Sequence, residues 1–163
     1  MLAASARHTR TALAWQLHSA NCIRRSFSRV GESASAVRTW TSDDVASFAA
    51  LTHDDNPIHA DDDFTAEARF GRPIVHGMLH ASMFGSIVGQ RCPGAVYVSQ
   101  TLRFRNPVHV GDTVTAEIVV QRVGGRGRLI EFATRSSKPG EEGEVIIVEG
   151  AARVLMPRTR IES

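Results

Sequence analysis

The pattern of hydrophobic and polar residues divides the chain into a helical half and a strand-rich half. Residues 73–90 contain no Asp, Glu, Lys or Arg, and their apolar side chains fall on nearly every face of a helix. A helix with this pattern is buried on all sides. Three glycines, two histidines and Gln90 within this segment argue against a membrane span. We therefore predict a helix in the protein core.

The last seventy residues alternate between apolar and polar positions, which is the period of a half-buried strand. We predict turns at 110–113 and 124–127, a hairpin loop over 137–143, and strands over 98–105, 114–121, 129–135 and 145–155. Upstream, Thr41 or Ser42 can cap a helix that runs to about Leu51, and a shorter helix is expected over 64–69. Antiparallel strands after one buried helix predict a single α+β domain over 36–158, with the sheet curled around that helix.

The N-terminal segment differs in charge from the rest of the chain. Residues 1–31 hold five arginines and no acidic side chain, so the net charge of +2 belongs to this segment and the remainder is mildly acidic. A nucleic-acid partner is therefore not expected. An Arg- and Ser-rich, acid-free segment is typical of an organellar transit peptide. We predict a leader over residues 1–30 that is processed near Arg25–Ser28 and addresses the protein to the mitochondrial matrix; a chloroplast address and a retained basic arm are the alternatives.

Three patterns resemble metal or nucleic-acid sites but lack essential members. His76 and His80 have the spacing of helical zinc ligands, but Gly77 stands where a metalloprotease has its glutamate. The segment 61–63 is three aspartates without the glycine and terminal glutamate of a calcium loop, and is expected to cap the next helix. The Gly–Arg alternation over 124–128 has no interleaved aromatic residues. We predict no metal ion in this protein.

A segment rich in acid, amide and imidazole groups connects the two upstream helices. Within it, Asn56-Pro57 fixes a turn, because proline locks its own φ angle and disfavours the helical conformation of the preceding residue. Such a turn can fold Asp54 and His59 toward one point, where a carboxylate and an imidazole can act on one water as a general acid–base pair. A polar loop whose Asn or Asp side chain caps the following turn fits these residues equally well.

Gly77 lies where the buried helix is expected to start. Backbone N–H groups at a helix N-terminus are unpaired and carry partial positive charge. They suit the oxygen of a carbonyl that becomes an enolate, and a glycine lets a ligand approach closely. The alternative is that Gly77 only allows tight packing of the helix against a strand.

Taken together, the motif Asp54-x-Asn56-Pro57-x-His59 and the segment Pro73–Met78 resemble the MaoC-like (R)-specific enoyl-thioester hydratases, also called hydratase 2. The resemblance continues through 100–108 and 110–114 and covers most of residues 40–155. It implies a hotdog fold, in which an antiparallel sheet wraps a central helix.

The resemblance also implies roles for particular residues. Asp54 and His59 would be the catalytic pair, Asn56 would hold the motif loop, and the backbone N–H of Gly77 would be the main oxyanion donor. His76 and Met78 would support the site or contact the substrate. One departure is that many members have glycine where this chain has His53, which could narrow the pocket, add a titrating group or point to solvent.

The implied reaction is reversible syn elimination of water from a (3R)-hydroxyacyl thioester, giving the trans-2-enoyl thioester, without a cofactor. With the leader, this places the protein in mitochondrial fatty acid synthesis. The expected partners are an acyl thioester of acyl carrier protein or coenzyme A and a second copy of the chain in a homodimer. Candidate phosphate contacts, with solvated strand-edge charges as the alternative, are Arg103, Arg105, Arg126 and Arg128.

Two other functions fit the same fold. A hotdog thioesterase would hydrolyse the acyl bond, but it needs a carboxylate on or near the central helix, and residues 73–90 have none. A non-catalytic acyl-thioester-binding module would use the pocket for recognition alone, and the intact Asp54/His59 pair argues against it.

Overall fold

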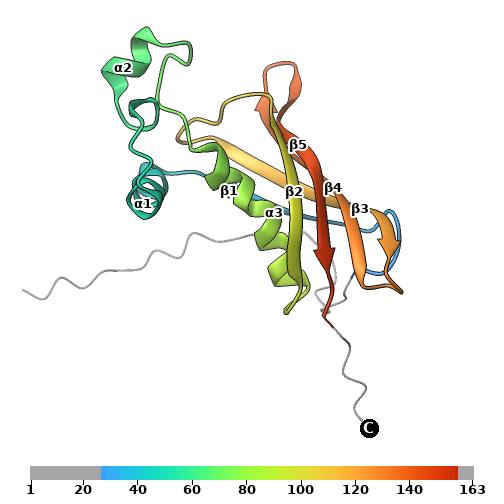
Figure 1. The fold of residues 1–163 in the computed structure, drawn as a ribbon. Helices are drawn as coiled ribbons and strands as arrows, with labels where there is room; N and C mark the ends of the chain where they lie inside the picture. The colour runs from blue at the N-terminus through green and yellow to red at the C-terminus, as the bar shows by residue number, and fades with distance from the viewer. Residues whose placement is uncertain (1–26, 158–163) are drawn as a thin grey trace, which may run out of the picture.

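The computed structural model describes residues 27–157, and most of the predicted leader (residues 1–26) lies outside this range (Figure 1). The elements in chain order are β1 (Ser33–Thr39), α1 (Ser42–Thr52), the 3-10 helix η1 (Pro57–His59), α2 (Asp62–Glu67), α3 (Gly77–Arg91), β2 (Val96–Phe104), β3 (Thr113–Gly124), β4 (Leu129–Gly140) and β5 (Gly143–Leu155). Within the described range, no helix combines the length and the apolar character needed to cross a membrane.

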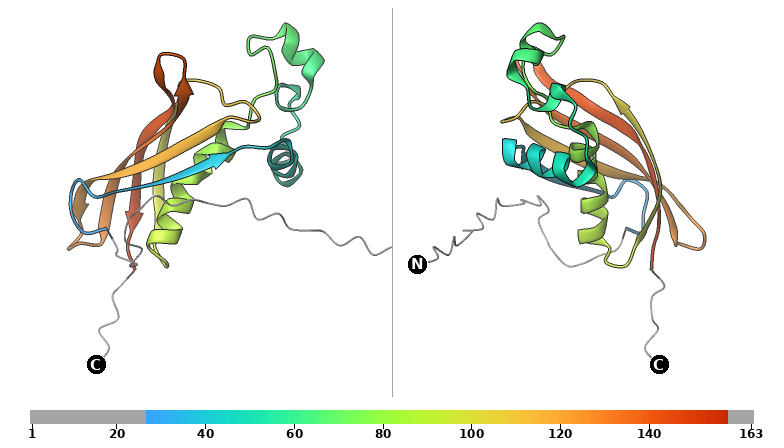
Figure 2. Two further views of the ribbon diagram at one scale, coloured as in Figure 1. Left: turned by 180° about the vertical axis from the view of Figure 1, so that it is seen from behind. Right: turned by 60° about the vertical axis from the view of Figure 1, so that its left-hand side comes forward.

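The five strands form one antiparallel sheet in the order β1-β3-β4-β5-β2. The sheet curves around α3, and α1, η1 and α2 lie beyond the end of the sheet at which α3 begins (Figures 1 and 2). This arrangement confirms the predicted α+β architecture, a hotdog fold with a buried central helix. The loops that precede α3 are therefore brought together at one end of the molecule.

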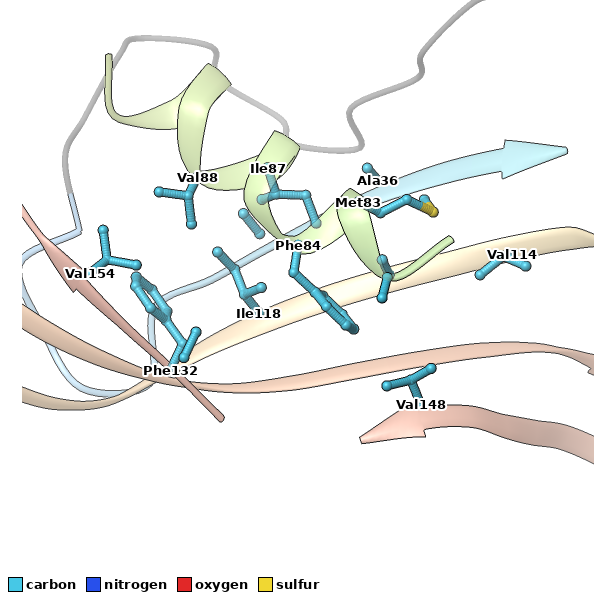
Figure 3. Close-up of a cluster of buried hydrophobic side chains, with 14 of the residues drawn as sticks. Ala36, Met83, Phe84, Ile87, Val88, Val114, Ile118, Phe132, Val148 and Val154 are labelled. Atoms are coloured by element: carbon cyan, nitrogen blue, oxygen red, sulfur yellow. The ribbon is translucent and has the colours of Figure 1, made fainter. Parts of the chain in front are cut away.

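The core lies between α3 and the concave face of the sheet (Figure 3). Apolar residues of α3 contact alternating inward-facing residues of four strands, as the period-two pattern predicts. The buried side chains labelled there are Ala36, Met83, Phe84, Ile87, Val88, Val114, Ile118, Phe132, Val148 and Val154. The prediction that this helix is buried on all sides is wrong in one respect: Met78, Ser82, Gly85 and Gly89 form an exposed stripe, because the sheet covers the other side of α3 and leaves this side open.

Two features of the sheet differ from the sequence prediction. β1 was not predicted; it pairs residue for residue with β3, and its inward positions are the small residues Ala34 and Ala36, which give a weak hydrophobic signal. β4 continues through Gly140, so the predicted loop over 137–143 is mostly strand. The inward residues of this part are polar, because Ser136 and Ser137 are buried, and this hides the alternation.

The chain already packs against the core at residue 27. Phe27 is 2% exposed, and its ring contacts Phe132 edge to face with centroids 4.9 Å apart. The Arg91 guanidinium lies 5.2 Å from the centre of the Phe27 ring, and Ser28 N–H donates a hydrogen bond to Glu32. Residues 27–32 are therefore part of the packed domain.

Candidate functional site

The loop that carries Asp54 starts where α1 ends. His53 is the C-terminal cap of α1, and its backbone adopts the left-handed conformation with φ 59° and ψ 27°. Glycine favours this conformation because it has no Cβ. The left-handed backbone at residue 53 therefore explains why glycine suits this position in the family that the sequence resembles. The His53 side chain is exposed and lines neither of the two hollows described below.

The turn predicted at Asn56-Pro57 is present as η1. Asn56 Oδ1 accepts a hydrogen bond from Ile58 N–H (3.3 Å), and Asn56 C=O accepts one from His59 N–H (3.0 Å). Asn56 therefore caps the turn with its side chain, as expected for a capping loop. The same turn also brings Asp54 and His59 together, as expected for an acid–base pair, so the two interpretations of this segment are compatible.

Asp54 and His59 face each other across a gap that suits one water molecule. Asp54 Oδ2 lies 3.9 Å from His59 Nε2, which is too far for a direct hydrogen bond. His59 Nδ1 lies 2.7 Å from the carbonyl oxygen of Ile74 and must donate to it. In the neutral ring this leaves the lone pair on Nε2, on the side of Asp54. The pair thus presents a carboxylate and an unprotonated imidazole nitrogen to the same point.

His76 supports both members of this pair. It is the N-cap of α3 and is 2% exposed. Its Nε2 donates to the backbone oxygen of Asp54 (3.1 Å), and its ring stacks on His59 with centroids 3.7 Å apart. The Phe48 ring contacts His76 as well, at 5.0 Å between centroids. The structure thus places His76 in contact with Asp54, His59 and Phe48.

Asp54, His59 and His76 are also the one group in the described part of the chain whose ligand atoms lie close enough for a metal ion, within 4.8 Å of one another. The donor chemistry does not favour one. His76 Nε2 carries the proton that it donates to Asp54 C=O, so two lone-pair donors remain, whereas a catalytic zinc ion takes three protein ligands. His80, the other member of the predicted zinc-like spacing, is not part of this group.

Gly77 is the first residue of α3, as predicted. Its N–H makes no hydrogen bond to the backbone of the described residues, and His76 provides no side-chain cap. A Cβ on Gly77 would lie 2.8 Å from Cε1 of Phe104, so glycine also permits the close approach of this ring. Met78, by contrast, is 60% exposed and lines neither hollow.

Two hollows adjoin the segment 73–76. The first, of about 680 Å³, contains both members of the Asp54/His59 pair. The second, of about 550 Å³, is lined by Gly77, His80 and Phe104, with Arg69 and Arg105 among the other lining residues. The structure therefore brings Asp54, Asn56, His59 and His76 together, and it places Gly77 in the adjoining hollow, one residue after the side chain that stacks on His59.

The candidate phosphate contacts are distributed unevenly. Arg105 lines the second hollow and is ion-paired with Glu149. Arg126 and Arg128 belong to the β3–β4 connection, which lies at the end of the sheet away from α1 and α2 (Figure 1). Arg69 and Phe104 also line the second hollow. No sequence motif marks them as site residues, because their positions depend on contacts between distant segments.

The family model described as a MaoC like domain matches residues 28–140. The chain belongs to the MaoC-like family. A relative from Aeromonas caviae, named (R)-specific enoyl-CoA hydratase, is 42% identical over 130 residues, which are 78% of this chain and 95% of that protein.

A second relative of this MaoC-like domain is an Arabidopsis thaliana protein named 3-hydroxyacyl-[acyl-carrier-protein] dehydratase, mitochondrial. It is 35% identical over 131 residues, which are 79% of this chain and 78% of that protein. Among solved structures, the (R)-hydratase from A. caviae involved in PHA biosynthesis superimposes with a TM-score of 0.73 at 40% identity, covering 79% of this chain and 97% of the other. The MaoC-like domain thus shares both fold and sequence with hydratases and dehydratases of acyl thioesters.

Proposed function

We propose that this MaoC-like domain hydrates trans-2-enoyl thioesters to (3R)-hydroxyacyl thioesters and catalyses the reverse dehydration. The observation that carries the proposal is the pair Asp54 and His59, with Oδ2 and Nε2 3.9 Å apart and the His59 lone pair turned toward the carboxylate. The names of the relatives from Aeromonas caviae and Arabidopsis thaliana support the same reaction and substrate class.

In the hydration direction, one water lies between Asp54 and His59. The carboxylate accepts a hydrogen bond from this water and orients it, while His59 Nε2 takes its proton as the oxygen attacks C3. The imidazolium then delivers that proton to C2 on the same face, and the pair returns to its starting state. The Asp54 carboxylate stabilises the imidazolium in between through its charge. Dehydration follows the same steps in reverse.

The thioester oxygen gains negative charge when C3 is attacked. The unpaired N–H of Gly77 at the start of α3 would donate a hydrogen bond to this enolate oxygen. A preorganised donor of this kind commonly stabilises the transition state by about 3 kcal/mol. This donor directly follows His76 in the chain, and the His76 ring stacks on the His59 imidazole, which supports a role for Gly77 next to the pair.

The physiological setting extends the same proposal. The thioester arrives on acyl carrier protein or coenzyme A, and the reaction takes part in fatty acid synthesis in the mitochondrial matrix after the leader is removed. The mitochondrial relative from Arabidopsis thaliana supports this setting. A homodimer is supported by the edge strand β2, where Val96, Val98 and Phe104 are each about half exposed.

The test is to incubate the purified protein with crotonyl-CoA and follow the loss of the conjugated enoyl-thioester absorbance. We expect hydration, and we expect the product to resist oxidation by a (3S)-specific hydroxyacyl-CoA dehydrogenase. Release of free thiol without hydration would instead identify a thioesterase. Binding of crotonyl-CoA with neither reaction would identify a non-catalytic module.

A further inference from the structure

His80 is a buried titratable group that the mechanism above does not use. It lies one turn after Gly77 on α3, and residues three apart share a face of a helix. Its ring meets Phe104 edge to face at 5.9 Å between centroids, and Gly77 packs against the same Phe104 ring. Gly77, His80 and Phe104 therefore surround one hollow, the second hollow of about 550 Å³.

The surroundings of His80 determine which nitrogen of its ring carries the proton. The side chain is 3% exposed, and burial lowers its pKa to about 4, so the ring is neutral at neutral pH. Nδ1 is enclosed and makes no hydrogen bond within the described part of the chain. Because an enclosed N–H without an acceptor is unfavourable, the proton is better placed on Nε2. Nε2 is not sealed in this way, and the ring lines the hollow.

We infer that His80 is a second oxyanion donor, whose Nε2–H acts together with the N–H of Gly77 on the thioester oxygen as it becomes an enolate. The inference rests on the proposed function, since it assigns a further catalytic residue to the same reaction. Both donors line one hollow, and both are held in place before the substrate arrives, Gly77 by the start of α3 and His80 by its burial. A donor that needs no rearrangement stabilises developing charge most effectively.

A neutral imidazole suits this role. It donates through Nε2–H without transferring its proton, so it polarises the carbonyl and does not compete with His59 for the proton of the water. The ring lines a hollow whose other lining residues include the apolar Val75, Phe104 and Val108. The two alternatives are that His80 only packs against Phe104, or that it binds another part of the substrate, such as an amide of the pantetheine arm.

Steady-state hydration of crotonyl-CoA by His80→Leu and His80→Gln separates these alternatives. Leucine keeps the apolar packing and removes the donor, whereas glutamine keeps an N–H at similar reach. We expect His80→Leu to lower kcat by about 100-fold with KM changed less than about threefold. We expect His80→Gln to recover at least about tenfold of that loss. Gln90→Leu, a polar-to-leucine change at an exposed position on the same helix, is the matched control and should keep wild-type kcat.

Three results would overturn the assignment: an unchanged kcat in His80→Leu, an equal loss in both His80 variants, or an effect confined to KM.

If His80→Leu does not fold, as thermal unfolding would show, 15N NMR of histidine-labelled wild-type protein tests the inference instead. The Nε2–H signal, assigned by its loss in His80→Gln, should move downfield when the unreactive thioester butyryl-CoA binds, and an unmoved signal contradicts the inference. A wild type that does not hydrate crotonyl-CoA overturns the proposed function and this inference together, whereas an active wild type with an unaffected His80→Leu overturns this inference alone.

Discussion

The imidazole rings of His59 and His76 are stacked, with their centroids 3.7 Å apart and their planes 25° from parallel. His59 belongs to η1 and His76 caps α3, so this contact joins the motif loop to the central helix. His76 also donates to the backbone oxygen of Asp54. One buried side chain thus contacts both Asp54 and His59.

His76 is therefore expected to act as a positioning residue. His76→Phe keeps a stacking ring and loses the hydrogen bond to Asp54 C=O, while His76→Gln keeps a donor and loses the stack. We expect each to lower kcat for crotonyl-CoA hydration by about 10- to 100-fold, because a displacement of about 1 Å in a catalytic group has effects of this size. KM should change much less. Wild-type kcat in both variants would show that the contact does not position the pair.

His53 is expected to be unfavourable for stability because its backbone is left-handed. His53→Gly relieves the cost that a Cβ imposes at this φ angle, and we expect the free energy of unfolding to rise by about 0.5–1 kcal/mol. Urea denaturation measures the change, and hydration activity should stay within about twofold, since the His53 side chain is exposed. His53→Val, with a branched Cβ, should lower the stability. Equal stability of the Gly and Val variants would show that this backbone angle does not matter.

The burial of His80 predicts an acid-sensitive fold. Its pKa is about 4 in the folded protein against 6.5 for an unperturbed histidine. Between these values the unfolded chain binds more protons than the folded one, so stability is full above pH 6.5 and falls as the pH is lowered toward 4. The loss attributable to His80 is at most about 3 kcal/mol.

The control for the acid-sensitive fold is His80→Leu, which should flatten the dependence of unfolding free energy on pH between 6.5 and 4. Burial favours the neutral form of Asp44 and Asp112, but hydrogen bonds, from Thr41 to Asp44 and from Lys138 to Asp112, outweigh it and hold their pKa values below 3.8. Their contribution is therefore lost at lower pH. An unaltered slope in His80→Leu would contradict the assignment.

Phe27 is expected to contribute strongly to stability although it precedes the first strand. Phe27→Ala removes a ring that is 2% exposed, and we expect a loss of about 3–5 kcal/mol in the free energy of unfolding. Val30→Ala is the control, since Val30 is 68% exposed, and it should cost less than about 0.5 kcal/mol. If the predicted leader is removed, a cut before Phe27 preserves the core. N-terminal sequencing of the mature protein should then find Phe27 retained, and a chain that starts after it would contradict this expectation.

The parts of the fold that could be predicted are those in which neighbouring residues carry the signal. The absence of charged residues in 73–90 predicts α3, and the alternation of apolar and polar residues predicts β3 and β5. The turn η1 is predicted by Asn56-Pro57 alone. β1 was missed because Ala34 and Ala36 are small, and pairing with β3 fixes it from eighty residues away. The neutral state of His80 and the stack of His59 on His76 depend on contacts between segments that are distant in sequence.

The central claim is that Asp54 and His59 act together on water at an enoyl thioester. The most direct measurement is the initial rate of crotonyl-CoA hydration by the wild type, Asp54→Asn and His59→Gln, with Asp55→Asn as the control at the neighbouring exposed carboxylate. We predict that the wild type hydrates crotonyl-CoA, that the first two variants each lose at least about 100-fold in kcat while remaining folded, and that Asp55→Asn stays within about threefold. An inactive wild type, or undiminished hydration in both Asp54→Asn and His59→Gln, would contradict the account.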